Sequence, residues 1–211
     1  MVFCYKMKYL PEKREIVLDK ELNNLDLFVL DFVKILEKHV DYVIISGYVS
    51  IVLGRTRITE DVDIFIKEIS EEKFLRLYED IKKRGFWCLN AEKGEEIFYF
   101  LKNKMAARFS RKEKPVPNFE VKFPKDSLDK ETFNDFVTIS LLKQKLKISS
   151  LERHIAFKRY YLASDKDEDD ALHIEELFKD KIDYNKINKL KELIKVKKNE
   201  EKKNFFKTRQ K

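Results

Sequence analysis

The chain has 211 residues, of which 43% are hydrophobic and 39% charged, and its formal net charge is +7; this allows one good core or two small ones. No stretch approaches the roughly 18 uncharged apolar residues of a membrane span, and the N-terminus meets charge too early for a signal peptide. The two cysteines, Cys4 and Cys88, lack a Cys-x-x-Cys spacing, so the sequence supports neither a disulfide framework nor a cysteine zinc site.

The positive charge is concentrated at the C-terminus. Residues 195–211 contain eight basic and two acidic residues, so this tail carries +6 and the rest of the chain about +1. Such a tail could contact nucleic acid phosphates, or it could be a solvated, frayed terminus. With no membrane span in view, the sequence predicts a soluble, cytoplasmic protein that has no membrane partner.

The first half of the chain is predicted to alternate helices and strands. Apolar residues fall at helical spacing after the capping residue Asn24, and Gly54 and Gly85 follow periodic segments that they are expected to end. The predicted elements are a helix from residue 24 to about 39, a strand at 42–45, a short helix from 47 to about 53, a strand at 62–66, a helix capped by Ser70 and a strand at 86–89.

The middle of the chain is predicted to contain further strands. Residues 94–105 fit a helix or a strand, and residues 106–112 fit a strand. Residues 117–123 alternate Phe119, Val121 and Phe123 with Glu120 and Lys122, which is the pattern of a half-buried strand. Nearby prolines suggest that this strand lies near a sheet edge, and residues 137–149 fit a small hairpin.

From Ser149 onward the pattern is helical. Ser149 with Glu152, and Asp165 with Glu168, form predicted capping boxes for two helices, and an amphipathic helix follows. The predicted fold class is α+β (mixed α/β), a mixed sheet with flanking helices followed by a helical subdomain. The predicted divisions are an α/β domain at 1–136, a hairpin with a helical subdomain at 137–197 and a basic flexible tail at 198–211.

Asp61 and Asp63 stand in an otherwise apolar run and form the first candidate site. Residues i and i+2 of a strand face the same side, so the two carboxylates would lie side by side and repel each other. A divalent cation removes that cost, because Mg²⁺ binds one or two carboxylates together with substrate phosphates. The alternative is that both acids are the solvent face of an edge strand.

The segment before this pair suits phosphate chemistry. Gly47 follows a buried strand and opens a helix whose N-terminus offers free N–H groups to an anion. Arg57 and Thr59 precede Asp61 by four and two residues, which allows them to add a positive charge and a hydroxyl near bound phosphates. Each feature is ordinary alone, but the whole set in this order predicts a phosphate and metal site.

These residues resemble the DNA polymerase β-like nucleotidyltransferase superfamily, in which a strand, a Gly-Ser or Gly-Gly turn, a helix and an acidic-x-acidic strand follow one another. Gly47 matches the glycine, and Asp61 and Asp63 match the metal-binding pair. The stretch "GRTRITEDVDIF" is most similar to the Arg-x-Ser/Thr-x-Asp-x-Asp form of AbiEii-type toxins and their stand-alone archaeal relatives. Tyr48 departs from the pattern, because it stands where the superfamily has Ser or Gly.

The resemblance implies a nucleotidyltransferase fold and a metal-dependent transfer of NMP from an NTP to an acceptor hydroxyl, with Mg²⁺ or Mn²⁺ as the cofactor. The resemblance to toxins favours tRNA or another RNA as the acceptor, with small molecules and protein hydroxyls as alternatives, and it makes an antitoxin a possible partner. The alternative is a catalytically degenerate module that binds nucleotide, RNA or a protein partner. The implied catalytic metal ligands are Asp61 and Asp63, and the implied nucleotide-binding positions are Gly47, Tyr48, Arg57 and Thr59.

A second group of candidates lies on the predicted helices of the last third of the chain. Lys158 interrupts an apolar stripe, where its ammonium either snorkels to solvent or points into the cleft at a triphosphate. Asp167 and Asp170 share a helix face near a helix start, which favours acids in any case. AbiEii-type toxins look similar here, and this resemblance implies that Lys158 and Asp170 are catalytic and that Lys158 and Asp167 bind nucleotide.

Glu120 is the candidate for the third metal carboxylate of the superfamily. It lies opposite the core-facing Phe119 and Val121 on a strand that could neighbour the Asp pair, although a solvent-facing edge glutamate is the alternative. Arg108 and Arg111 could line the same cleft, but the sequence does not place them. The three histidines show no metal-ligand spacing.

Overall fold

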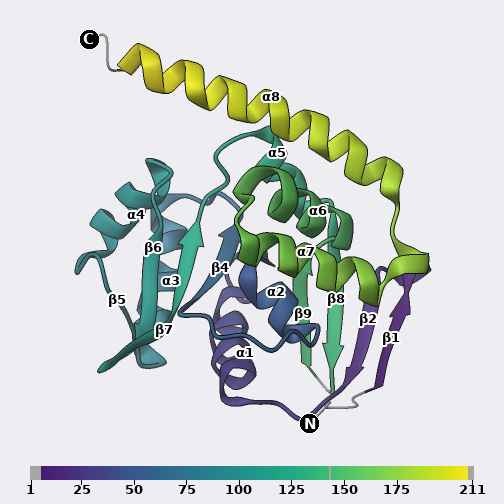
Figure 1. The fold of residues 1–211 in the computed structure, drawn as a ribbon. Coiled ribbons are helices and arrows are strands. Elements are labelled where there is room, and N and C mark those ends of the chain that lie inside the picture. The colour runs from purple at the N-terminus through teal and green to yellow at the C-terminus, as the bar shows by residue number, and fades with distance from the viewer. Residues whose placement is uncertain (1–5, 143, 209–211) are drawn as a thin grey trace. The chain divides into compact units, whose positions relative to one another are not determined.

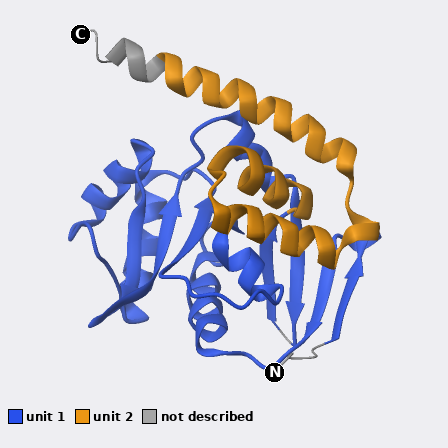
Figure 2. Cartoon of the chain, viewed as in Figure 1, with its two compact units in different colours: residues 1–149 blue, residues 150–211 orange. Residues whose placement is uncertain are grey.

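The computed structural model describes residues 6–142 and 144–208 (Figure 1). The chain divides into two compact units between Ser149 and Ser150 (Figure 2). Unit 1 contains all the strands of the described residues, and unit 2 contains only helical segments. The boundary lies after the hairpin at 137–149, which the sequence placed with the helical subdomain. The hairpin belongs to unit 1 because its two strands join the sheet of that unit.

Unit 1 is built on a mixed sheet of nine strands, counted over the described residues, in the order β1-β2-β8-β9-β3-β4-β7-β6-β5. The strands are β1 (Lys6–Leu10), β2 (Glu15–Asp19), β3 (Tyr42–Ile45), β4 (Asp61–Ile66), β5 (Phe86–Cys88), β6 (Ala107–Arg111), β7 (Lys114–Lys122), β8 (Phe136–Leu141) and β9 (Gln144–Ser149). The helices are α1 (Asn24–Leu36), α2 (Gly47–Val52), α3 (Glu71–Lys83), α4 (Gly94–Lys102) and α5 (Ser127–Lys130), with the 3-10 turns η1 (Pro11–Lys13) and η2 (Glu131–Phe133). This architecture confirms the predicted mixed α/β class.

The side-chain alternation of β4 explains the burial of its two faces. Val62, Ile64 and Ile66 are fully buried, whereas Asp61 and Asp63 face the other side and stay partly accessible. β4 lies between β3 and β7. The interpretation of these acids as the solvent face of an edge strand is therefore wrong.

Aromatic stacking holds α1 against the sheet. Phe28 and Phe32 of α1 stack on Phe119 of β7, with ring centroids 4.3 and 4.1 Å apart, and Phe86 of β5 meets Phe32 edge-on. Each such pair contributes about 0.5–1.5 kcal/mol beyond the burial of its area. Because Phe119 points into this core, the neighbouring Glu120 points to the opposite face of the sheet.

The proline-rich strand β7 is an interior strand, which contradicts the edge position predicted from its prolines. It pairs with β4 in parallel and with β6 antiparallel. Pro115 and Pro117 precede Asn118, where the pairing with β4 begins, and the pairing with β6 shifts register between Ser110 and Arg111. The prolines, which lack an N–H donor, thus fall outside the regular ladder.

Two N-terminal strands were not among the predicted elements. β1 and β2 form an antiparallel pair, and β2 pairs in parallel with β8. Ile16 and Leu18 fill the buried face of β2, and Arg14 between the strands has a left-handed backbone with φ 47°. The charged residues around these few apolar positions hide the alternation in the sequence.

Unit 2 is helical, as predicted. Its segments are α6 (Leu151–Ala156), the π-helical η3 (Phe157–Leu162), α7 (Asp165–Leu177), the 3-10 turn η4 (Lys179–Lys181) and α8 (Tyr184–Thr208). α8 continues through residues 198–208, where the sequence predicted a flexible tail. None of the helices in the described part of the chain is both long and apolar enough to cross a membrane.

The caps of α6 and α7 each lie one residue from the predicted position. The Ser150 side chain, and not that of Ser149, accepts a hydrogen bond from the backbone N–H of Arg153 and caps α6. α7 begins with a capping box of Ser164 and Asp167, in place of the predicted box of Asp165 and Glu168. Adjacent polar residues compete for each cap, so the sequence alone does not select between them.

Candidate active site

The sheet register places three carboxylates on neighbouring interior strands. Asp63 of β4 lies opposite Glu120 of β7, and Asp61 lies opposite Asn118. Glu120 lies in turn opposite Arg108 of β6. The predicted third carboxylate therefore stands beside the Asp pair, and the alternative of an edge glutamate is wrong.

The ammonium group of Lys122 lies between two of these carboxylates. Its Nζ atom is 2.6 Å from Asp63 Oδ1 and 2.7 Å from Glu120 Oε2. Arg108 donates to Glu120 Oε1 through Nε at 2.9 Å and Nη2 at 2.6 Å. Hydrogen bonds between charged groups are stronger than those between neutral groups. Asp63, Glu120, Lys122 and Arg108 thus form an ionic network that joins three strands.

Burial shifts the protonation equilibria of this ionic network. Burial raises the pKa of Asp63, against the opposing charge of Lys122, and the Asp61 and Glu120 carboxylates raise it further. Burial acts in the same direction on Glu120, but the hydrogen bonds and charges of Lys122 and Arg108 hold its pKa below the usual value. Burial opposes the charged form of Lys122, yet the two carboxylates raise its pKa. Lys122 is thus protonated at neutral pH, and Asp63 binds a proton more readily than an ordinary aspartate.

The turn between β3 and α2 adjoins the carboxylates. Ile45, the last residue of β3, pairs with Asp63, so the following Ser46 and Gly47 lie beside the start of β4. Ser46 has φ 59° and ψ −138°, a region that residues with a side chain rarely occupy. Backbone strain of this kind is common at functional sites. Ser46, where it occurs here, lies at the predicted phosphate turn.

The guanidinium group of Arg57 packs against Gly47, so a side chain at position 47 would displace it. A Cβ atom added to Gly47 would lie 2.1 Å from Arg57 Nη2, which is closer than unbonded atoms can approach. Further along the same loop, Thr59 Oγ1 donates to the carbonyl oxygen of Asp61 at 2.9 Å. The loop between α2 and β4 therefore brings Arg57 to Gly47 and Thr59 to Asp61.

Tyr48 points into the core. Its side chain is 0% exposed, and its hydroxyl donates to Asp26 Oδ1 at 2.9 Å. Burial raises the pKa of Tyr48, and the Asp26 carboxylate raises it further. Asp26 also lies 2.9 Å from Lys20 Nζ and accepts from the backbone N–H of Asn23 at 3.0 Å. This buried polar network holds the Tyr48 side chain in the core, and nucleotide binding at position 48 stays a prediction.

Lys158, Asp167 and Asp170 form an ion cluster within unit 2. Lys158 is 3% exposed, and its Nζ atom lies 2.7 Å from Asp167 Oδ1 and 2.9 Å from Asp170 Oδ2. Burial acts to raise the pKa of Asp167, but hydrogen bonds from Lys158 and Ser164 hold it below the usual value. The ammonium of Lys158 ends on carboxylates inside the protein, so the snorkelling interpretation is wrong.

The donor atoms near β4 are of the kind that a hard divalent cation binds. Asp61, Asp63 and Glu120 offer carboxylate oxygens, and the Oδ1 atom of Asn118 is buried and accepts no hydrogen bond within the described residues. Mg²⁺ and Mn²⁺ bind oxygen ligands of this type. In the part of the chain that the structure describes, no three His, Cys, Asp or Glu side chains are already grouped to hold a metal ion. A cation thus fits this donor set only when Lys122 leaves the two carboxylates that it contacts.

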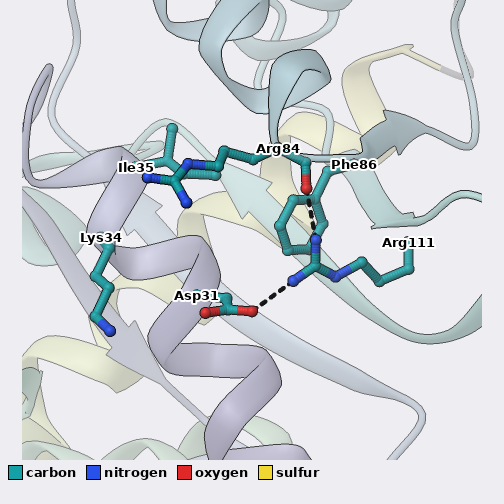
Figure 3. A pocket seen from close by; sticks show the side chains of 6 residues that line it. All are labelled: Asp31, Lys34, Ile35, Arg84, Phe86 and Arg111. Carbon is teal, nitrogen blue, oxygen red and sulfur yellow. Dashed lines mark hydrogen bonds and ion pairs between the residues drawn. The ribbon is translucent and has the colours of Figure 1, made fainter.

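Arg111 lines a different pocket of unit 1 (Figure 3). It donates to Asp31 Oδ2 and to the carbonyl oxygen of Arg84, each at 2.5 Å, and its guanidinium lies 4.0 Å from the centre of the Phe86 ring. The pocket has a volume of about 100 Å³ and is lined by Asp31, Lys34, Ile35, Arg84, Phe86 and Arg111. Of the two arginines that the sequence left unplaced, Arg108 joins the carboxylates and Arg111 does not.

A family model described as "Nucleotidyl transferase of unknown function (DUF2204)" matches residues 24–209. The match includes the carboxylates of unit 1 and the ion cluster of unit 2. The chain belongs to this nucleotidyltransferase family. No curated protein matches the chain.

A solved structure supports the same fold. The chain is similar to an antigenic nucleotidyltransferase-like protein from Paracoccidioides brasiliensis, with 18% sequence identity and a TM-score of 0.51 over 85% of this chain and 91% of that one. At this level of identity the likeness shows a shared fold. The nucleotidyltransferase-like fold that the resemblance implied is therefore confirmed.

Sequence reasoning about this member of a nucleotidyltransferase family missed Lys122. The alternation of "FEVKF" puts Lys122 on the same face as Glu120, which was a usable signal. Its contact with Asp63 depends on how β4 and β7 align, and one sequence does not reveal that register. Asp26, which fixes Tyr48, was missed for a similar reason, because the two residues lie on separate helices.

We expect Gly47→Ala to displace Arg57 without unfolding the protein. The atoms that a Cβ would meet are the far end of the flexible Arg57 side chain. NTP binding, measured by calorimetry, should weaken about tenfold or more in Gly47→Ala and in Arg57→Met, because a hydrogen bond to a charged group contributes about 1.5–3 kcal/mol. The midpoint of urea unfolding should change little in either variant.

The double variant of Gly47 and Arg57 tests whether the two changes act through the same guanidinium group. The losses should not add, since each single change already removes that group from the turn. Additive losses would show that Gly47 and Arg57 act separately. Arg76→Met, which removes an exposed arginine of α3 paired with Glu72, is the control and should leave NTP binding unchanged.

Proposed function

We propose that this protein is a metal-dependent nucleotidyltransferase that transfers NMP from an NTP to an acceptor hydroxyl. The observation that carries the proposal is the register that brings Glu120 beside Asp63, next to the turn at Gly47. The family match supports nucleotidyl transfer in general. The similarity of "GRTRITEDVDIF" to AbiEii-type toxins supports a toxin-like member of the superfamily.

In this reaction the acceptor oxygen forms a bond to the α-phosphorus of the NTP. The bond from that phosphorus to the β-phosphate breaks, pyrophosphate leaves with the electron pair, and the acceptor proton passes to solvent. Bound Mg²⁺ or Mn²⁺ would neutralise charge on the phosphates and lower the pKa of the acceptor hydroxyl. Asp61, Asp63 and Glu120 are the proposed ligands, Arg57 at the Gly47 turn binds the terminal phosphates, and Thr59 orients Asp61.

The ion cluster of unit 2 belongs to the same proposal. Lys158 is the proposed triphosphate ligand, and Asp170 is the proposed catalytic carboxylate that the resemblance implies. Asp167, at 2.7 Å from Lys158, orients the ammonium group and also closes the capping box of α7. The assignment is supported by the pairing of all three residues within one unit.

The proposed acceptor is tRNA or another RNA, and the proposed protein partner is an antitoxin. The eight basic residues among positions 195–211 support an RNA acceptor, because lysine and arginine side chains bind the phosphate backbone and release its counterions. The resemblance to toxins supports the antitoxin.

Labelled nucleotides test the proposed reaction. The protein is incubated with Mg²⁺ or Mn²⁺, tRNA and each NTP, labelled either in the α-phosphate or in the γ-phosphate. Label from the α-position should enter the RNA, and label from the γ-position should leave as pyrophosphate. Transfer of γ-label would indicate a kinase. Equally low transfer by the wild type and by Asp63→Ala to every acceptor would rule out the enzyme.

The second candidate is a catalytically degenerate module. It is favoured by the contacts of Lys122 with Asp63 and Glu120, because these contacts occupy the oxygen atoms that a metal ion would need. Such a module would bind NTP through Arg57 and the turn, without a divalent cation. Calorimetry of NTP binding with and without Mg²⁺ separates the two candidates. The enzyme should need the metal, whereas the module should bind NTP equally well in its absence.

A further inference from the structure

We propose that Lys122 is an internal counter-cation, which neutralises Asp63 and Glu120 when no divalent ion is bound and is displaced when one binds. The proposal deepens the proposed function and rests on it, because it concerns the same carboxylates. It assigns to Lys122 a role in setting metal affinity, and it makes the displaced ammonium group available to the phosphates of the nucleotide.

The position of the ammonium group is the first observation. Lys122 Nζ contacts one oxygen of Asp63 and one oxygen of Glu120, at 2.6 and 2.7 Å, and so bridges β4 and β7. A divalent ion that links carboxylates on neighbouring strands needs those oxygens as ligands. Lysine and metal therefore compete for the same atoms.

The second observation is that Lys122 can leave while the rest of the ionic network stays. Its charge sits at the end of a flexible four-carbon stem, and its side chain is 25% exposed, so a path to solvent exists. Arg108 binds Glu120 through Oε1, whereas Lys122 uses Oε2. Withdrawal of Lys122 thus frees Oε2 of Glu120 and Oδ1 of Asp63, and Arg108 still orients Glu120.

The net charge of these side chains favours binding of a metal ion before that of a nucleotide. Among these five side chains of β4, β6 and β7, the three carboxylates of Asp61, Asp63 and Glu120 outnumber the two cations, Lys122 and Arg108, so the group has an excess of one negative charge. This excess repels a triphosphate and attracts a metal ion. After exchange, the divalent ion and Arg108 balance the three carboxylates, and the released ammonium adds positive charge close by. Metal binding should therefore precede or accompany nucleotide binding.

Direct metal binding tests the exchange. Free Mn²⁺ is measured by electron paramagnetic resonance during titration of the full chain, without nucleotide. Lys122→Met should bind Mn²⁺ at least tenfold more tightly than the wild type, because the competing ammonium is gone. Lys122→Arg should bind no more tightly than the wild type, because it keeps a cation at the site. Equal or weaker Mn²⁺ binding by Lys122→Met would overturn the proposal.

Two control variants test whether the gain in Mn²⁺ affinity arises at Asp63. Lys104→Met removes another lysine of unit 1 that pairs with a glutamate, Glu68, at 2.5 Å, and it should leave Mn²⁺ binding unchanged. Asp63→Asn combined with Lys122→Met should abolish the gain in affinity. Persistence of the gain in that double variant would mean that Mn²⁺ binds elsewhere, and it would also overturn the proposal.

The rise in melting temperature on addition of Mn²⁺ is a second measurement. If Lys122 only formed a structural ion pair, this rise would not be larger in Lys122→Met than in the wild type. Without metal, Lys122→Met should melt at a lower temperature than the wild type, because Asp63 and Glu120 lose their shared cation. Saturating Mn²⁺ should raise its melting temperature more than that of the wild type, since tighter binding stabilises more. If the variant needs Mn²⁺ to fold, recovery on its addition supports the exchange. No recovery, or a smaller rise than in the wild type, counts against it.

The two proposals can fail separately. Mn²⁺ binding involves no NTP, so a tenfold gain in Lys122→Met together with no transfer of α-label in the wild type would overturn the proposed reaction alone. Transfer of α-label by the wild type without any gain in Mn²⁺ affinity in Lys122→Met would overturn the exchange alone.

Discussion

Asp63→Asn should lower nucleotidyl transfer by about a thousandfold or more. The substitution keeps the shape of the side chain and removes the charge that would hold a divalent cation. A bound metal contributes several kcal/mol to transition-state stabilisation, and each ~1.4 kcal/mol corresponds to a tenfold change in rate. The rate of α-label transfer to RNA, measured at saturating metal and NTP, gives the loss directly.

The fold of Asp63→Asn should survive. Lys122 keeps Glu120 as a partner at 2.7 Å, and burial already disfavours the charged form of Asp63 by raising its pKa. Asp41→Asn is the matched control, because Asp41 is an exposed aspartate of unit 1 that pairs with Lys147 at 3.3 Å; its transfer rate should stay within about twofold of the wild type. Retention of a tenth or more of the activity in Asp63→Asn would exclude Asp63 as an essential metal ligand.

Tyr48→Ser should destabilise the protein by about 3–5 kcal/mol, although the superfamily that the chain resembles has serine or glycine at this position. The substitution removes a fully buried ring and takes a hydrogen-bond donor from Asp26. Urea unfolding followed by circular dichroism measures the change as a lower midpoint. A loss of activity in this variant would then report loss of fold, and not a missing phosphate contact.

One further substitution at Tyr48 separates the contributions of its ring and its hydroxyl to stability, and a substitution at Tyr99 is the control. Tyr48→Phe keeps the ring and removes only the hydroxyl, so it should cost about 1–3 kcal/mol by leaving the buried Asp26 one donor short. Tyr99→Ser changes a tyrosine that is 60% exposed and should shift stability by about 0.5 kcal/mol or less. If Tyr48→Ser were as mild as Tyr99→Ser, the ring could not be part of the core.

The local parts of the site were accessible from the sequence. The alternation around Asp61 and Asp63 predicted a strand with both acids on one face, and the alternation around Glu120 predicted a second strand; both are present. These predictions succeed because side-chain direction in a strand depends only on position along it. The catalytic and metal-binding roles of these residues stay predictions.

The parts of the site that depend on alignment between strands were not accessible. Whether Lys122 meets Asp63 is decided by one residue of register between β4 and β7. The buried partner of the Tyr48 hydroxyl, Asp26, lies on another helix. The prolines of β7 gave the wrong position in the sheet, because a local shift in register accommodates them. Each of these outcomes arises from tertiary packing, which local patterns do not encode.

The buried carboxylate of Asp26 links the N-terminal strands to the predicted phosphate turn. β1 and β2 precede residue 24 and lie outside the family match, yet Lys20, directly after β2, contacts Asp26 at 2.9 Å. Asp26 in turn holds the hydroxyl of Tyr48, the neighbour of Gly47. A segment outside the family match is thus two polar contacts away from the predicted phosphate turn. Loss of the Lys20 ammonium would remove a cation that pairs with this fully buried carboxylate, and breaking one side of a buried ion pair is costly.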